Sequence, residues 1–301
     1  MSDPRGGDPG RRRAVTPATA GPDDLVARVR RGEALVLDGG LATELERAGH
    51  DLSGQLWSAR LLRDDPEAIL AVHRAFRDAG AEVLTTASYQ ASVAGYESVG
   101  VGPARARRLI ADSVALARRA LDATPGDGWV AGSCGAYGAS LADGSEYRGR
   151  YGVPVAALVA FHAERAAILL DAGADLLAFE TLPSHLEAVA VAEVLAGLPQ
   201  VAAWASFTSP DGRHTPEGVP LEEAAAPLAG VDGVVALGVN CLQPAAVGAA
   251  LEVLRPLGTP LVVYPNAGDT WDGDARRWLA TTARATPVDN SPVGSGRLAR
   301  R

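Results

Sequence analysis

Lysine is absent from this chain of 301 residues, so all 28 of its basic residues are arginine. Schiff-base aldolases, pyridoxal-phosphate enzymes and Walker-type nucleotide sites all depend on a lysine amine. The composition therefore excludes these three kinds of chemistry.

Cysteine is almost as scarce, and Cys134 and Cys241 are the two that the chain contains. So few cysteines do not make a disulfide framework, and they predict a reducing, cytoplasmic location. The apolar runs are interrupted by glycine, proline or charge, and they fall far below the roughly 18 residues that a membrane-spanning helix needs. The amino-terminal residues contain no apolar segment like that of a secretory signal. We therefore expect a cytoplasmic protein with no membrane partner.

Positive charge is in deficit as well, since the formal net charge is −8 at pH 7. This balance argues against general binding to nucleic acid. Hydrophobic residues make up 47% of the chain and charged residues 21%, which is ordinary for a globular protein with a sizeable core. The length suits one barrel of about 250 residues. We predict a disordered extension at 1–24, a barrel domain at 25–280 and an irregular or disordered tail at 281–301.

Short apolar runs alternate with segments of helical periodicity, which is typical of βα units around a parallel sheet. The predicted strands are Ala34–Asp38, Ala81–Thr86, Trp129–Ser133, Ala174–Glu180, Val201–Phe207, Gly233–Asn240 and Pro260–Tyr264. The predicted helices include Asp65–Ala79, Pro103–Asp122, Pro154–Ala172, Ser184–Leu195, Leu221–Leu228 and Ala245–Leu254.

This succession of units favours an α/β fold of the (β/α)8 TIM-barrel type, although a doubly wound open sheet stays possible. After Trp278 no apolar run is able to form a buried strand. We therefore expect the last βα unit to be missing or degenerate.

Polar residues stand where several of these strands end, at the edge on which a βα barrel builds its site. We expect Asp38 and Glu180 to point into the mouth, where carboxylates act as acid and base or bind an ammonium group. Two other interpretations remain open. In the first, Asp38 begins a glycine turn and Glu180 caps the next helix; in the second, the paired carboxylates belong to a glycosidase.

Cys241 follows an apolar run, which places a thiol at the rim of the predicted site. A single cysteine is more often a small buried hydrophobe than a ligand, and the chain has no CxxC or HxxxH pair for zinc. His73 and His162 fall within amphipathic helices and are expected to be packing residues. His185 and His214 lie in or beside polar loops, without a partner that the sequence reveals.

Six blocks of sequence, in order between Ala34 and Trp278, match one known family. They read LDGGLATELERAG (37–49), TTASYQAS (85–92), GSCGAYGASLADGSEYRG (132–149), FETLP (179–183), GVNC (238–241) and VVYPNAGDTWD (262–272). The chain resembles the homocysteine S-methyltransferases.

The resemblance implies a barrel in which zinc, held by three cysteine thiolates, binds the homocysteine sulfur and lowers its pKa. The thiolate then takes a methyl group from a sulfonium, either S-methylmethionine or, more slowly, S-adenosylmethionine, and the product is methionine. Displacement at a methyl group needs no proton shuttle, only alignment of the thiolate with the donor. The implied partners are therefore L-homocysteine and a sulfonium methyl donor.

The resemblance also assigns roles to individual residues. Asp38 and Glu180 would hold the homocysteine ammonium group, and Gly39–Gly40 would let the backbone approach the amino acid closely. Tyr89 and Trp57 would line the donor side, where an aromatic face suits a sulfonium cation.

Cys241 is the catalytic cysteine and the first zinc ligand that the resemblance implies, with Asn240 bracing the metal rim. The family supplies its other two thiolates from a GGCC motif on the last strand, and this chain has no such motif. A frameshift or truncation would account for that loss, and His185 or His214 could replace a ligand. The alternative function is a zinc-free, catalytically impaired homologue that only binds a sulfur amino acid.

Overall fold

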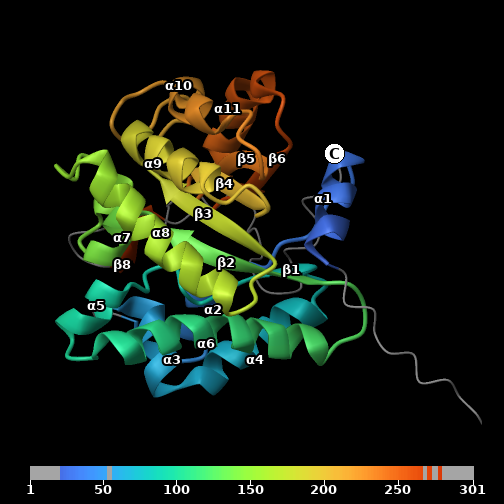
Figure 1. The fold of residues 1–301 in the computed structure, drawn as a ribbon, viewed down its shortest axis with the longest axis vertical. Coiled ribbons are helices and arrows are strands. Elements are labelled where there is room, and N and C mark those ends of the chain that lie inside the picture. Colours follow the sequence, from blue (N-terminus) through green and yellow to red (C-terminus); the bar gives the residue numbers. More distant parts are fainter. Residues whose placement is uncertain (1–20, 53–55, 267–269, 273–276, 280–301) are drawn as a thin grey trace, which may run out of the picture.

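The computed structural model describes residues 21–52, 56–266, 270–272 and 277–279. Its main sheet has six parallel strands whose spatial order follows the chain. They are β1 (Val83–Thr85), β2 (Trp129–Gly135), β3 (Leu176–Leu182), β4 (Ala203–Phe207), β5 (Val234–Asn240) and β6 (Leu261–Tyr264). The sheet curls into a half-barrel with helices outside it, and Figure 1 shows α4 and α6 on one side of it and α9, α10 and α11 on the other.

The helices alternate with these strands, as expected for βα units. They are α1 (Pro22–Arg30), α2 (Leu41–Arg47), α3 (Leu61–Asp64), α4 (Pro66–Asp78), α5 (Val93–Ser98), α6 (Pro103–Asp122), α7 (Tyr137–Leu141), α8 (Val155–Asp171), α9 (His185–Ala196), α10 (Leu221–Ala225) and α11 (Pro244–Leu254). The 3₁₀ segments are η1 (Trp57–Arg60), η2 (Ser145–Tyr147), η3 (Ala226–Leu228) and η4 (Arg255–Leu257). The six predicted helices are thereby confirmed, except that 221–228 divides into α10 and η3 because Pro227 has no N–H for the α-helical bond.

The first predicted strand is reduced to a single bridge. Leu37 pairs in parallel with Val83. The carbonyl of Val36 accepts from the N–H groups of both Glu82 (2.8 Å) and Val83 (3.2 Å), and the N–H of Asp38 donates to Val83 (3.0 Å). Ladder bonds thus involve only residues 36–38, so the segment takes the first place beside β1 without the length of a strand.

The full eight-unit barrel is not confirmed. The remaining described strands, β7 (Thr270–Asp272) and β8 (Arg277–Leu279), pair with each other in an antiparallel arrangement and form a separate sheet. Within the described part of the chain, the parallel sheet therefore ends at β6.

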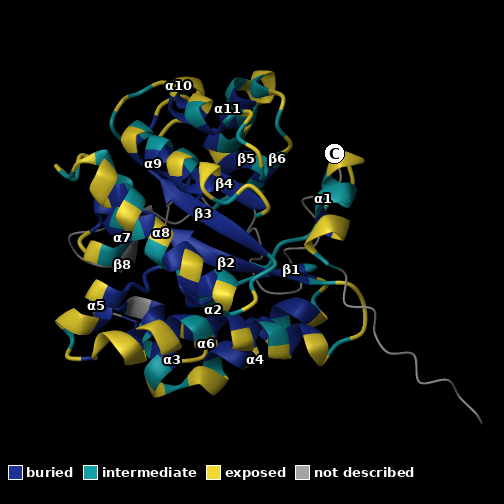
Figure 2. Ribbon diagram, in the orientation of Figure 1, coloured by how far each residue is buried: buried dark blue, intermediate teal, exposed yellow. Residues whose placement is uncertain are grey.

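Apolar side chains divide between the two faces of the curled sheet. The larger cluster lies between the sheet and its helices, and Figure 2 shows the strands as a buried layer beneath helices that expose one side. The smaller cluster lines the concave face and includes Leu25, Val83, Trp129, Leu176, Trp204 and Val262. Alternate residues of each strand supply the two clusters, as the period of a strand requires.

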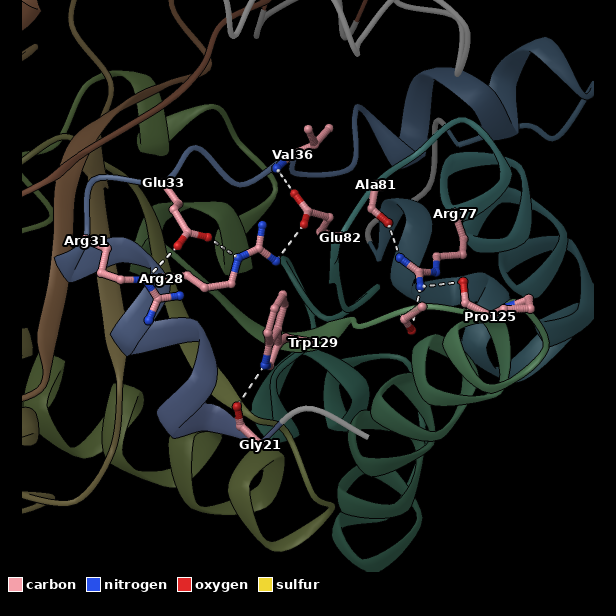
Figure 3. A network of polar contacts seen from close by, with 11 residues as sticks. Gly21, Arg28, Arg31, Glu33, Val36, Arg77, Ala81, Glu82, Pro125 and Trp129 are labelled. Carbon is pink, nitrogen blue, oxygen red and sulfur yellow. Dashed lines mark hydrogen bonds and ion pairs between the residues drawn. The ribbon is translucent and has the colours of Figure 1, made fainter. Parts of the chain in front are cut away.

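Helix α1 covers the amino-terminal end of the strands. Gly21 accepts a hydrogen bond from the indole N–H of Trp129 (2.9 Å), and Arg28 forms an ion pair with Glu82 (2.7 Å). Figure 3 shows that Glu82 also receives the N–H of Val36, so one carboxylate joins α1 to the first sheet segment. This arrangement leaves the opposite, carboxyl end of the strands for a site.

The described residues cover only part of the predicted domain limits. Helix α1 begins at Pro22, so the last residues of the predicted extension 1–24 are helical. Residues 1–20 and the predicted tail 281–301 lie outside the described residues. No helix in the described segments has the length and apolar character needed to cross a membrane.

His73, on α4, is a packing residue as predicted, and it makes stability depend on pH. It is fully buried, its ring nitrogens have no hydrogen-bond partner among the described residues, and burial lowers its pKa from 6.5 to about 4. Below about pH 6.5, His73 therefore becomes protonated in the unfolded chain but stays neutral in the folded chain. Stability is fully present above that pH and is lost as the pH falls toward 4, by about 2 kcal/mol at pH 5.

We expect His73→Leu to lose about 2 kcal/mol less stability than the unaltered chain between pH 8 and pH 5. Urea unfolding at the two pH values measures the difference. Equal losses in the two proteins would contradict the prediction, because all other titrating groups are shared.

Candidate functional site

Glu180 lies near the carboxyl end of β3 and is 6% exposed. Its carboxylate accepts hydrogen bonds from the hydroxyls of Ser133 on β2 and Tyr264 on β6. Burial raises the pKa of Glu180, and these two bonds oppose the rise. The N-cap of α9 is Ser184, so the interpretation of Glu180 as a helix cap is wrong.

Asp38 is the last residue of the first sheet segment and faces the same edge. Its carboxylate accepts the N–H (2.7 Å) and the hydroxyl (2.8 Å) of Thr85. Burial raises the pKa of Asp38 to about 7, the two bonds from Thr85 oppose this, and the charge of Glu180 adds to it. The fold thus brings the two predicted carboxyl groups close enough to interact.

Asn240 joins the ends of three strands and is 1% exposed. Its side-chain oxygen accepts from the N–H of Thr181 (2.8 Å) and the hydroxyl of Ser206 (2.9 Å). Its amide nitrogen donates to the hydroxyl of Thr181 (2.8 Å) and the thiol of Cys241 (3.4 Å). Thr181 (φ 63°) and Cys241 (φ 51°) both have left-handed backbone, which is strained for residues other than glycine. Asn240 therefore stabilises a strained rim.

The Cys241 thiol is half-buried at this rim. Burial raises the pKa of Cys241 to about 12, with Glu180 and Glu146 adding to the rise and the hydroxyls of Thr181 and Tyr147 opposing it. The thiol is therefore protonated at neutral pH when no cation is near it.

Glu146 and Tyr147 reach the site from η2, in the long loop after β2, and sequence reasoning did not single them out. The hydroxyl of Tyr147 hydrogen-bonds to Cys241. Glu146 is 6% exposed, and one of its oxygens has no hydrogen-bond partner among the described residues. Burial raises the pKa of Glu146 to about 7. Their only sequence signal is an acidic–aromatic pair in a glycine-rich loop, because the distance to Cys241 depends on how that loop folds back.

Tyr89 follows β1 and is half-buried, and its hydroxyl lies near Thr181 beside Cys241. Gly39 packs against Phe76, whose ring would be 2.7 Å from an added Cβ, so a packing requirement accounts for this glycine. The predicted approach of Gly39–Gly40 to a substrate stays a prediction. The side chain of Trp57 lies outside the described residues.

The described residues do not form a three-ligand zinc site. Cys134 is fully buried in β2, and no group of three His, Cys, Asp or Glu side chains among those described is arranged to hold a metal ion. His214 pairs instead with Asp211 (2.8 Å). The role of Cys241 as a zinc ligand therefore stays a prediction, and the chain contains no third cysteine.

A family model described as homocysteine S-methyltransferase matches residues 35–294. The chain is 48% identical over 261 residues to the homocysteine S-methyltransferase of Escherichia coli (strain K12), across 84% of each chain. The chain belongs to the homocysteine S-methyltransferase family. It is also 41% identical over 258 residues to the homocysteine S-methyltransferase YbgG of Bacillus subtilis (strain 168), across 81% of each chain.

A solved relative has the same fold. The crystal structure of the metallated form of the homocysteine methyltransferase MmuM from Escherichia coli superposes with a TM-score of 0.76, at 49% identity, over 81% of this chain and 88% of that one. The family assignment from the six sequence blocks is therefore confirmed. In this member of the homocysteine S-methyltransferase family, the six blocks lie at the ends of the first sheet segment, β1, β2, β3, β5 and β6.

Proposed function

We propose that this chain is a homocysteine S-methyltransferase that transfers a methyl group from S-methylmethionine, or from S-adenosylmethionine, to L-homocysteine and forms methionine in the cytoplasm. The single observation that carries the proposal is the cluster of Asp38, Glu180 and Glu146 around one thiol rim. A mouth of this composition suits a ligand that has both a cationic group and a sulfur atom.

Binding of the amino acid follows from the charges of the mouth. The amino group of homocysteine is protonated at neutral pH, and buried carboxylates bind such an ammonium group by charge-assisted hydrogen bonds. Glu146 supports this role because it is buried and has an oxygen without a hydrogen-bond partner among the described residues. Tyr89 and Tyr147 would lie along the sulfur end of the ligand, where aromatic faces attract a sulfonium donor.

The transfer is a displacement at carbon. The homocysteine sulfur forms a bond to the methyl carbon, the bond from that carbon to the donor sulfonium breaks, and the electron pair neutralises the donor as a thioether. The thiol proton of homocysteine passes to solvent water before the attack, so the attacking species is the thiolate. Holding the two sulfur atoms in line with the methyl carbon is the main contribution that the site can make.

Zinc is the group that the family implies for activating the sulfur, and the residues present do not make the three-thiolate site described for the family. The negative charges of Glu180 and Glu146 also disfavour ionisation of the Cys241 thiol.

The lack of a three-thiolate zinc site among the described residues favours a second function. The chain would then bind homocysteine or a related sulfur amino acid through Asp38, Glu180 and Glu146 without transferring a methyl group.

One set of measurements separates the two functions. Purified full-length chain is dialysed extensively and analysed for zinc, then supplied with L-homocysteine and S-methylmethionine, with Cys241→Ala as the control. Methionine formation together with about one zinc atom per chain, both lost in Cys241→Ala, would support methyl transfer and show that other ligands complete the site. Binding of L-homocysteine without methionine formation would support the second function, and the absence of both would overturn both.

The affinity for L-homocysteine should rise with pH. Asp38 and Glu146 have pKa values raised to about 7, and an ammonium group binds the ionised carboxylates. Below pH 7 a bound cation must displace protons, so the dissociation constant increases by about tenfold for each pH unit and carboxyl group. Isothermal titration calorimetry between pH 5.5 and 8.5 measures this slope.

Asp38→Asn is the matched variant for this titration. It should bind more weakly at pH 8 and show a flatter pH dependence, because one of the titrating carboxyl groups is gone. An affinity that stays constant between pH 5.5 and 8 in the unaltered chain would contradict ammonium binding by these carboxyl groups.

A further inference from the structure

Arg165 is a buried cation on α8, with 1% of its surface exposed. Its guanidinium donates to main-chain carbonyl groups rather than to carboxylates. The acceptors are Gly135 (2.7 Å), Tyr89 (2.8 Å) and Ser88 (3.1 Å). The ring of Phe161 lies 4.8 Å from the guanidinium carbon. A single side chain from the helical layer thus bonds to two separate segments at the edge of the mouth.

Those two segments also contact each other. An added Cβ at Gly135 would lie 2.4 Å from the carbonyl oxygen of Tyr89 and 2.5 Å from its ring, so only glycine allows this close packing. Arg165 binds both carbonyl groups on either side of the contact. The hydroxyl of the same Tyr89 reaches Thr181 beside the thiol rim.

The fold alone does not require a charge at this position. Transfer of a guanidinium into the interior costs several kcal/mol, and an apolar side chain of similar volume often packs at least as well. A comparable residue, Arg77 on α4, is 7% exposed and donates to the carbonyl groups of Ala81 and Gly126 (2.9 Å each). Ala81 and Gly126 shortly precede β1 and β2, so these bonds lie at the amino-terminal end of the strands, where Figure 3 labels Arg77 beside Ala81. The two arginines share their chemistry but serve opposite ends of the same strands.

We propose that Arg165 is a positioning residue of the amino-acid site, which holds Tyr89 at the mouth by fixing its main chain against Gly135. The functional part of this proposal rests on the homocysteine binding proposed above. Arg165 acts from behind the sheet through the main chain of Tyr89, and its charge also lowers the pKa of Glu180.

The first test compares Arg165→Met with Arg77→Met in the full-length chain, at a temperature where circular dichroism shows both to be folded. Hydrogen exchange of residues 86–92 should increase at least tenfold in Arg165→Met and stay unchanged in Arg77→Met. Equal protection of this segment in the two variants would overturn the positioning role. This measurement needs no ligand. It therefore tests the positioning role of Arg165 even if the chain binds no homocysteine and the proposed function fails.

Affinity for L-homocysteine provides the second readout, measured by calorimetry. We expect the dissociation constant to rise at least tenfold in Arg165→Met and to stay within twofold in Arg77→Met, although both variants melt at a lower temperature. Arg165→Lys keeps the charge and one donor direction, so it should recover part of the affinity. It also replaces Arg165→Met in both readouts if that variant does not fold. A similar change of affinity in the Met variants at 165 and 77 would overturn the proposal.

A double variant tests whether the effect passes through Tyr89. Once Tyr89→Ala has removed the ring, adding Arg165→Met should cause no further loss of affinity, because interacting residues are not additive. Independent, multiplying losses would overturn the proposed route.

Discussion

Glu180→Gln is expected to raise the dissociation constant for L-homocysteine about 100-fold and to leave the folded chain at least as stable. The substitution keeps the shape and the acceptor oxygen for Ser133 but removes the negative charge that an ammonium group needs. Loss of one buried charge-assisted contact costs about 3 kcal/mol, which is the stated factor. Stability does not suffer, because burial already disfavours the charged form of Glu180.

Asp175→Asn is the matched control for this variant. Asp175 is also a largely buried carboxylate at a strand of the same sheet, but it bonds to Arg118 (2.6 Å) and to the N–H of Val130 (2.7 Å) at the amino-terminal end. We expect it to lose stability while its affinity stays within twofold. Calorimetry and urea unfolding measure both quantities for both variants. An unchanged affinity in Glu180→Gln would remove Glu180 from the binding site.

Asn240→Leu is expected to lower the free energy of unfolding by about 3 kcal/mol or more. Its side chain satisfies the N–H of Thr181 and the hydroxyl of Ser206, and each buried polar group left without a partner costs about 1–3 kcal/mol. Thr181, whose backbone is strained, would also lose both of its hydrogen bonds to Asn240. Chemical denaturation with urea measures the loss.

Asn240→Asp distinguishes the two halves of this amide. It keeps the oxygen that accepts from Thr181 and Ser206 but removes the donor to the Thr181 hydroxyl and the Cys241 thiol. We expect a smaller loss of stability than in the Leu variant, together with a displaced Cys241. A Leu variant as stable as the unaltered chain would show that the rim does not depend on this amide.

Much of the fold could be predicted because burial leaves a periodic trace in the sequence. The run 129–133 and the segment 103–122 were expected as a strand and a helix, and the structure has β2 and α6 there. The first segment failed as a strand because only residues 36–38 make ladder bonds to β1. Ladder length depends on a neighbour in space, and no local pattern reports it.

The candidate site was predictable where a residue ends a strand and not elsewhere. Asp38, Glu180 and Cys241 were expected at the rim, and they interact there in the structure. Glu146 was missed because it belongs to a loop, and a loop has no periodicity to show which way it folds. Arg165 was missed because helical periodicity in 154–172 does not show which side chain reaches the main chain of Tyr89 and Gly135.

The sequence by itself determined the family, the order of the βα units and the set of polar residues at the carboxyl edge, because those properties depend on residue type and local periodicity. It also limited the zinc chemistry, since a chain with two cysteines cannot supply three thiolates. The tertiary structure alone decided which carboxyl groups meet, how far burial raises the pKa of Asp38 and Glu146, and that Asn240 joins two strained residues. These properties depend on distances across the sheet and on exclusion of water, which arise only when segments far apart in the chain pack together.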